Sequence, residues 1–178
     1  MILDALLQFD AAINLAQVAG SYNSTNILDL GGPAIPALAS GQGARDIGIG
    51  DDPTMKLLVQ VTTTFTSGGA GTLAVNFQGN TDNGSGAPTA TWTTWYTSPT
   101  YALATLVAGA RLYDMDMPRP PDGIAIPRFV RMSYIIGGAT MTAGNLSAFI
   151  VLDRMDQSYQ STNNAIMGGY PPGIVIAN

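Results

Sequence analysis

Hydrophobic and polar residues alternate along much of this chain, which is the period of a β-strand with one buried face. The alternation is clearest in KLLVQVTTTFT (56–66), where apolar side chains occupy nearly every second position. It recurs in TLAVNFQ (72–78) and RFVRMSYII (128–136). LSAFIVL (146–152) is a more continuous apolar run, which is typical of a strand covered on both faces. These four segments predict the main strands.

Weaker patterns predict further short strands at NILDL (26–30), DIGIG (46–50), TWTTWYT (91–97), YALATLV (101–107) and RLYDM (111–115). The glycine-rich links SGGAG (67–71) and GGATMTAGN (137–145) predict hairpins between the strands that they join. About nine short strands separated by Gly, Pro, Asn and Asp favour a sandwich or barrel over βαβ units. The predicted fold is all-β, a jelly-roll β-sandwich of two antiparallel sheets with an arm at each end of the chain.

The N-terminal segment has a different pattern. In residues 1–25, Leu3, Leu6 and Ile13 have helical spacing, and Asp4 is a possible N-cap. The segment is therefore predicted to be either a short helix or an extended arm. Its acidic start lacks the positive charge of a secretory signal, so we expect no signal peptide.

The jelly-roll domain is predicted over residues 26–156, and residues 157–178 are predicted to form an extended C-terminal arm. Glycines and prolines interrupt this arm before it finishes in an apolar triplet, which needs a surface to cover it. The triplet either docks on its own domain or adds as a strand to a neighbouring subunit. The triplet consists of Ile174, Val175 and Ile176.

The chain carries little charge. Hydrophobic residues make up 46% and charged residues 11%, against about 25% charged in an average domain. The net charge of −5 and the scattered basic residues exclude a phosphate-binding surface, so no nucleic-acid partner is expected. Apolar runs are too short to cross a bilayer, and no membrane partner is expected. A polar but neutral surface is cheap to desolvate, which favours extensive contact with other proteins.

The sequence contains few of the residue types that commonly support catalysis. Histidine, cysteine and glutamate are absent, which excludes triads based on histidine and His/Cys metal clusters. In LYDMDMPRPPDG (112–123), Asp114, Asp116 and Asp122 imitate part of a calcium loop, but the residues after Asp116 supply no regular oxygen ligands. We interpret this segment as a strand that ends near Met115, a proline-stiffened crossing and a turn. No enzyme activity, cofactor or metal is expected.

Aromatic residues gather in TWTTWYTSP (91–99). Strand alternation would place Trp92 and Tyr96 on one face and Trp95 on the other. Either these rings form a lectin-like sugar platform, or one ring joins the core while the other lies at an interface or covers a loop. The predicted interface residues are Trp92, Trp95, Tyr96, Tyr170, Ile174, Val175 and Ile176.

Several segments, in order, resemble the cement or decoration proteins of tailed-phage (podovirus-type) capsids. They are STNILDLG (24–31), ARDIGIGDDPTMKLLVQVTTTFT (44–66), GTLAVNFQGNTDN (71–83), LVAGARLYDMDMP (106–118) and RFVRMSYIIGGATMTAGNLSAFIVLD (128–153). The resemblance implies a jelly roll that assembles as a homodimer or homotrimer. It also implies binding to the major capsid protein across capsomere junctions, without enzymatic activity or cofactor. The location implied is the outer capsid surface of the virion, reached from the host cytoplasm during assembly. Residues 119–127 and the tail from Gln157 depart from the family pattern.

Overall fold

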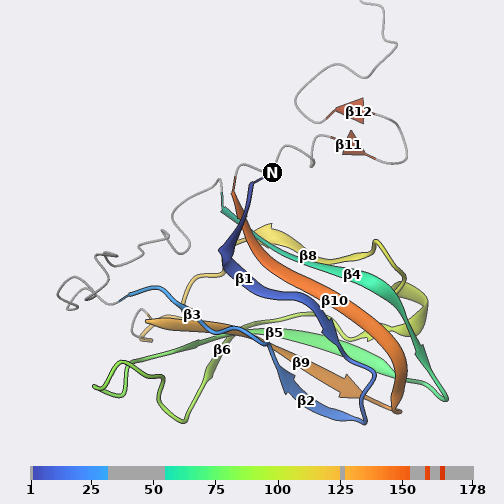
Figure 1. Cartoon of the computed structure of the whole chain (residues 1–178), viewed down its shortest axis with the longest axis horizontal. Helices are drawn as coiled ribbons and strands as arrows, with labels where there is room; N and C mark the ends of the chain where they lie inside the picture. Colours follow the sequence, from blue (N-terminus) through green and yellow to red (C-terminus); the bar gives the residue numbers. More distant parts are fainter. Residues whose placement is uncertain (1, 32–54, 125–126, 153–158, 161–164, 167–178) are drawn as a thin grey trace, which may run out of the picture.

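The computed structural model describes residues 2–31, 55–124, 127–152, 159–160 and 165–166 (Figure 1). Nearly all regular structure in these ranges is β, as predicted, and no helix among them has the length and apolar character needed to span a membrane. The strands are β1 (Ile2–Asn14), β2 (Gly20–Asn23), β3 (Leu28–Asp29), β4 (Met55–Ser67), β5 (Thr72–Asn80), β6 (Thr93–Thr97), β7 (Tyr101–Ala102), β8 (Arg111–Asp116), β9 (Phe129–Gly137), β10 (Met141–Leu152), β11 (Tyr159–Gln160) and β12 (Ala165–Ile166).

Two antiparallel sheets pack face to face, which confirms the predicted β-sandwich (Figure 1). The four-stranded sheet has the order β1-β10-β4-β8. The six-stranded sheet has the order β2-β9-β5-β6, with β3 beside β9 and β7 beside β5. These orders fit a jelly roll, because the antiparallel pairs β1–β10, β2–β9, β4–β8 and β5–β6 are divided between two sheets.

The core lies between the sheets and is built from the inward faces of the alternating strands. Phe9, Val59, Phe77, Tyr134 and Ile150 are among its fully buried side chains. The rings of Phe9 and Phe77 meet edge to face, with centroids 6.1 Å apart. Because successive residues of a strand point to opposite faces, burial of these positions directs the polar positions outward.

The two glycine-rich links are not hairpins, which corrects the sequence prediction. β4 pairs with β10 and β8, whereas β5 pairs with β9, so the link 67–71 carries the chain from one sheet to the other. The link from β9 to β10 does the same. The two crossings touch, since a Cβ on Gly138 would collide with the carbonyl oxygen of Ala70, and Gly138 has a φ of +74°. The alternation of apolar and polar residues identifies the buried face of a strand, but it does not tell which strand pairs with it.

Of the two alternatives predicted for the N-terminal segment, the short helix is wrong, because residues 2–14 form β1 at the edge of the four-stranded sheet. Leu7 and Phe9 are buried in the core, as in any strand with one inward face. The pairing of β1 with β10 shifts register between Leu3 and Gln8, and twice more before Ile13. These irregularities break the two-residue period and produce the helix-like spacing. The sandwich therefore begins before residue 26, and no separate N-terminal arm precedes it in the described residues.

The shorter predicted strands have mixed outcomes. RLYDM corresponds to β8, but NILDL supplies only the two residues of β3. YALATLV is shorter as a strand than predicted, since β7 ends at Ala102 and Leu103–Thr105 form a 3₁₀ turn. DIGIG lies outside the described residues. Within the predicted C-terminal arm, β11 and β12 pair with each other and form their own small sheet.

Candidate interaction surface

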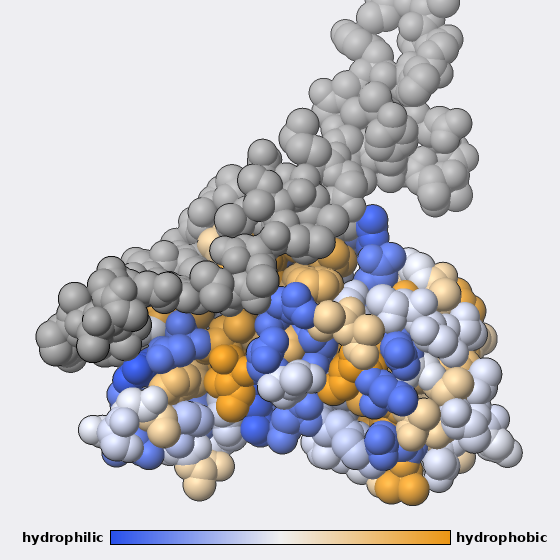
Figure 2. Space-filling view, in the orientation of Figure 1, coloured by the Kyte–Doolittle hydropathy of each residue, from blue (hydrophilic) through white to orange (hydrophobic). Residues whose placement is uncertain are grey.

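The outward face of the six-stranded sheet is mainly polar and carries few charges, and its middle residues Asn76 and Ser133 are buried. Its residues alternate with core residues such as Val75, Phe77, Met132 and Tyr134. Paired positions across the strands place the outward residues in rows: Asn23, Ser133, Asn76 and Thr97; Ser21, Ile135 and Ala74; Arg131, Gln78 and Thr94. Figure 2 shows mainly white and blue residues on the side where this sheet lies, with smaller orange areas. We call these residues, together with Trp92, the outer sheet face.

Arg131 is the one charged residue of the outer sheet face, and two neighbouring strands hold its side chain. Its guanidinium lies over the ring of Trp92, 4.1 Å from the centroid, which is a cation–π contact. Its Nε donates a hydrogen bond to Oε1 of Gln78 at 2.9 Å. Gln78 in turn donates from Nε2 to the hydroxyl of Thr94 at 3.1 Å. Partial burial lowers the pKa of Arg131.

The predicted distribution of the aromatic rings is wrong. Phe77 pairs with Tyr96 and Gln78 pairs with Thr94, so Trp95 is an extra residue between the two pairs. A bulge of this kind lets successive side chains share a face. Trp95 and Tyr96 therefore both pack against the core, which leaves Trp92 alone on the outer sheet face. Three rings of one segment do not form a shared sugar platform.

Interior contacts hold Trp95 and Tyr96 in place. The ring of Trp95 meets Phe77 edge to face with centroids 5.6 Å apart, and Tyr96 meets Tyr113 in the same way at 5.2 Å. Trp95 also lines a small cavity of about 60 Å³ beside Gly79 and Pro127. The Nε1 donor of Trp95 is buried without a hydrogen-bond partner in the structure.

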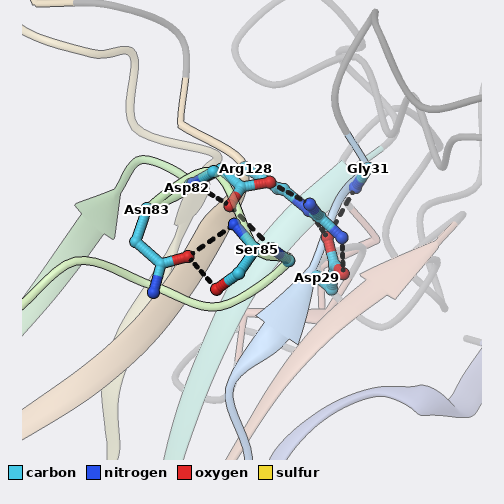
Figure 3. A network of polar contacts seen from close by, with 8 residues as sticks. Asp29, Gly31, Asp82, Asn83, Ser85 and Arg128 are labelled. Carbon is cyan, nitrogen blue, oxygen red and sulfur yellow. Dashed lines mark hydrogen bonds and ion pairs between the residues drawn. The ribbon is translucent and has the colours of Figure 1, made fainter.

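Charged residues gather around Arg128, at the start of β9, in the network that Figure 3 shows. Arg128 donates from Nε and Nη2 to the two carboxylate oxygens of Asp29, each at 2.9 Å, and from Nη1 to Asp82. Burial acts against ionisation of Asp29, but the hydrogen bonds from Arg128 and from the Gly31 N–H keep its pKa below the ordinary value. The network ties β3 and the loop after β5 to β9, and it has the role of a structural clamp.

Asp82 also organises its own loop. Its Oδ1 accepts hydrogen bonds from the N–H groups of Gly84 and Gly86, at 2.8 and 2.9 Å. The Gly86 N–H contributes most to lowering the pKa of Asp82, with the Gly84 N–H and Arg128 adding to it. Gly84 and Gly86 have φ values of +90° and +85°, which glycine adopts without strain. The loop is therefore held by backbone donors and by one arginine.

The acidic segment 112–123 agrees with its interpretation as a connection. β8 ends at Asp116, one residue beyond the predicted end, and a turn follows at Asp122 and Gly123. Asp116 forms an ion pair with Lys56 of β4. In the ranges that the structure describes, no three acidic, histidine or cysteine residues lie close enough to hold a metal ion.

Sequence reasoning identified Trp92 but missed its partners. The contact of Trp92 with Arg131 depends on which strands are neighbours in the sheet. The alternation of apolar and polar residues in the sequence does not reveal that pairing. The available signal was a lone arginine on the polar face of RFVRMSYII. The remaining predicted interface residues, Tyr170, Ile174, Val175 and Ile176, lie outside the described residues.

A protein-family model described as Bbp16 matches residues 14–150. The match includes β2 to β9 completely and most of β10, so it covers nearly the whole sandwich. The family is associated with phages. No curated protein matches the chain.

Proposed function

This chain belongs to the phage-associated Bbp16 family, and from that premise we propose that it is a structural protein of the virion that stabilises the head. In this proposal it is a capsid cement protein. It binds the outer surface of the shell at junctions between capsomeres, with the major capsid protein and further copies of itself as partners. Its role is adhesion, without catalysis or a cofactor. The observation that carries the proposal is the family match across nearly the whole sandwich.

The outer sheet face has properties that suit such adhesion. It is rigid, because each strand is fixed in register by the buried residues on its other side. The hydroxyl and amide groups of its exposed residues are less costly to desolvate than charges, and they supply donors and acceptors for a partner. These residues include Ser21, Asn23, Thr94 and Thr97. A specific protein contact buries about 1,600 Å² in total, which requires a continuous surface of roughly 800 Å² on each partner.

Repetition of the contact explains how a small protein could strengthen a large shell. A symmetric oligomer presents the same face several times, so each contact after the first is intramolecular. Modest individual interfaces then add up to very slow dissociation. A subunit that spans a junction resists separation of the capsomeres on both sides of it.

The test is cosedimentation of the purified protein with expanded heads that lack it, together with its mass in solution. We expect saturable binding by an oligomer. Thr97→Arg, which places a long charged side chain on the outer sheet face, should weaken binding at least about tenfold by leaving a charge without a partner. Thr62→Arg is the matched control, because Thr62 is an exposed residue of β4 in the other sheet.

A monomer without affinity for heads would overturn the proposal. Equal binding by the two arginine variants would instead show that the outer sheet face is not the surface of attachment. Binding to glycans on an array, with Trp92 fluorescence responding to the sugar, would support a lectin-like module in place of a cement protein.

A further inference from the structure

Among the residues that the structure describes, Arg131 has no carboxylate partner, whereas three other basic residues have one. Lys56 pairs with Asp116, Arg111 with Asp114, and Arg128 with both Asp29 and Asp82. Among the described residues, the contacts of Arg131 are its hydrogen bond to Gln78 and its stacking on Trp92. Its Nη groups have no hydrogen-bond partner in the described structure, and they are not among the buried polar atoms.

The Arg131 side chain is also held in one position before any partner arrives. The Trp92 ring lies against one face of the guanidinium, and Gln78 accepts from Nε, which leaves the edge that carries the Nη donors unused. An arginine held in this way loses less conformational entropy on binding than a free surface arginine. The side chain is also partly buried, so its cation is incompletely solvated, and this burial lowers the pKa of Arg131.

We propose that Arg131, held by Trp92 and Gln78, binds a carboxylate side chain of the protein to which the outer sheet face attaches. The unused donors of a planar guanidinium match the two oxygens of an Asp or Glu. The residues paired with Arg131 across the sheet are neutral, and Asp29 of β3, the acidic residue of this sheet beside β9, is already held by Arg128. Arginine and tryptophan are among the residue types that dominate binding energy in protein interfaces.

Charge favours a carboxylate of a protein over a phosphate of nucleic acid. A phosphate backbone presents regularly spaced charges and is bound by clusters of basic residues. The outer sheet face has one cation, on a chain with a net charge of −5. A single isolated acidic side chain within an otherwise neutral contact fits this arrangement. The inference rests on the proposed function, since it takes the shell protein as the partner.

The experiment compares binding to untreated heads with binding to heads whose exposed carboxylates have been converted to amides by carbodiimide and glycinamide. Arg131→Gln should bind untreated heads at least about tenfold more weakly than the wild type, because a charge-assisted pair is lost. The wild type should lose about as much on amidated heads. Arg131→Gln should not be affected by amidation. Arg131→Lys keeps the charge but lacks the forked donors of a guanidinium. It should bind untreated heads with an affinity between those of the wild type and Arg131→Gln.

Lys56→Gln is the matched control, because it removes the same charge from the other sheet, and it should bind like the wild type on both kinds of head. Circular dichroism and the unfolding midpoint establish that each variant is folded before binding is measured. If the wild type does not bind untreated heads, the proposed function fails. If the wild type binds but Arg131→Gln binds equally well, or amidation affects both proteins alike, the role of Arg131 is refuted and the proposed function stands. Competition by short duplex DNA would also overturn it.

Discussion

Replacing Gly79 with alanine should expel Trp95 from its position against the core. A Cβ on Gly79 would lie against Cζ2 of Trp95, 2.5 Å from Cε2 and 2.8 Å from Nε1. Real side chains do not approach so closely, so the ring must move. Trp95 is wedged between Gly79 and the edge-to-face contact with Phe77, and its outward movement breaks that contact.

The cost of this substitution can be estimated from its parts. Forcing an extra methyl group into a packed site costs about 1–3 kcal/mol. Loss of the Phe77 contact accounts for about 0.5–1.5 kcal/mol of this. Reduced freedom of the unfolded chain offsets about 0.4–1 kcal/mol. We therefore expect a net destabilisation of about 1–2 kcal/mol, which lowers Tm by roughly 2–8 °C in a chain of this size.

Gly68→Ala is the matched control, because nothing lies within 4 Å of the position where its Cβ would be, and Gly68 has no positive φ. It should be neutral or slightly stabilising. Urea unfolding measures the free energies, and a Trp92→Phe background makes Trp95 the only tryptophan, so a red shift of its emission reports exposure. In a Trp95→Ala background, Gly79→Ala should no longer lower the free energy of unfolding, because the ring that it displaces is absent. Equal stability of the two alanine variants with unchanged emission would refute the predicted packing of Trp95.

Two further predictions concern buried or paired carboxylates. Tyr134→Phe removes the hydroxyl that donates to Asp10 Oδ2 at 2.6 Å, in a site where both residues are buried. It should lower the free energy of unfolding, measured in urea, by about 1–3 kcal/mol. A decrease below about 0.5 kcal/mol would contradict the buried hydrogen bond. Asp29 and Asp82 have pKa values below their ordinary 3.8, so the stability that they contribute is present above pH 3.8 and is lost as the pH falls through their lower folded values. Arg128→Gln should therefore reduce stability most near neutral pH and least in strong acid. If the difference between the urea midpoints of the wild type and Arg128→Gln stays constant from pH 7 to pH 2, the proposed clamp is contradicted.

The sequence allowed the main strands to be predicted because their buried faces repeat every second residue. β4, β5 and β9 each begin and end within two residues of the predicted bounds. β1 was missed because its pairing with β10 is irregular, and the extra residue at Trp95 put Tyr96 on the core face instead of the face of Trp92. In both cases a bulge disturbs the period on which the prediction depends.

The candidate site was less predictable than the fold. Arg131 becomes distinctive only because Gln78 and Trp92, from β5 and the segment before β6, lie beside it. Alternation assigns Arg131 to the polar face but does not say which residues surround it or whether a carboxylate is near. The predicted hairpins failed for the same reason, since β4 and β5, like β9 and β10, belong to different sheets.

The pairing of β1 with β10 has a consequence for synthesis on the ribosome. Ile2 pairs with Leu152 and Asn14 with Asn145, so β1 has no partner strand until β10 has been made. β10 also lies between β1 and β4, and a nascent chain that ends before Met141 would leave both of those strands with unpaired edges. Closure between such distant segments is slow compared with local pairing. The four-stranded sheet therefore reaches its native pairing only after β10 has been translated, so the sandwich completes its folding late in synthesis.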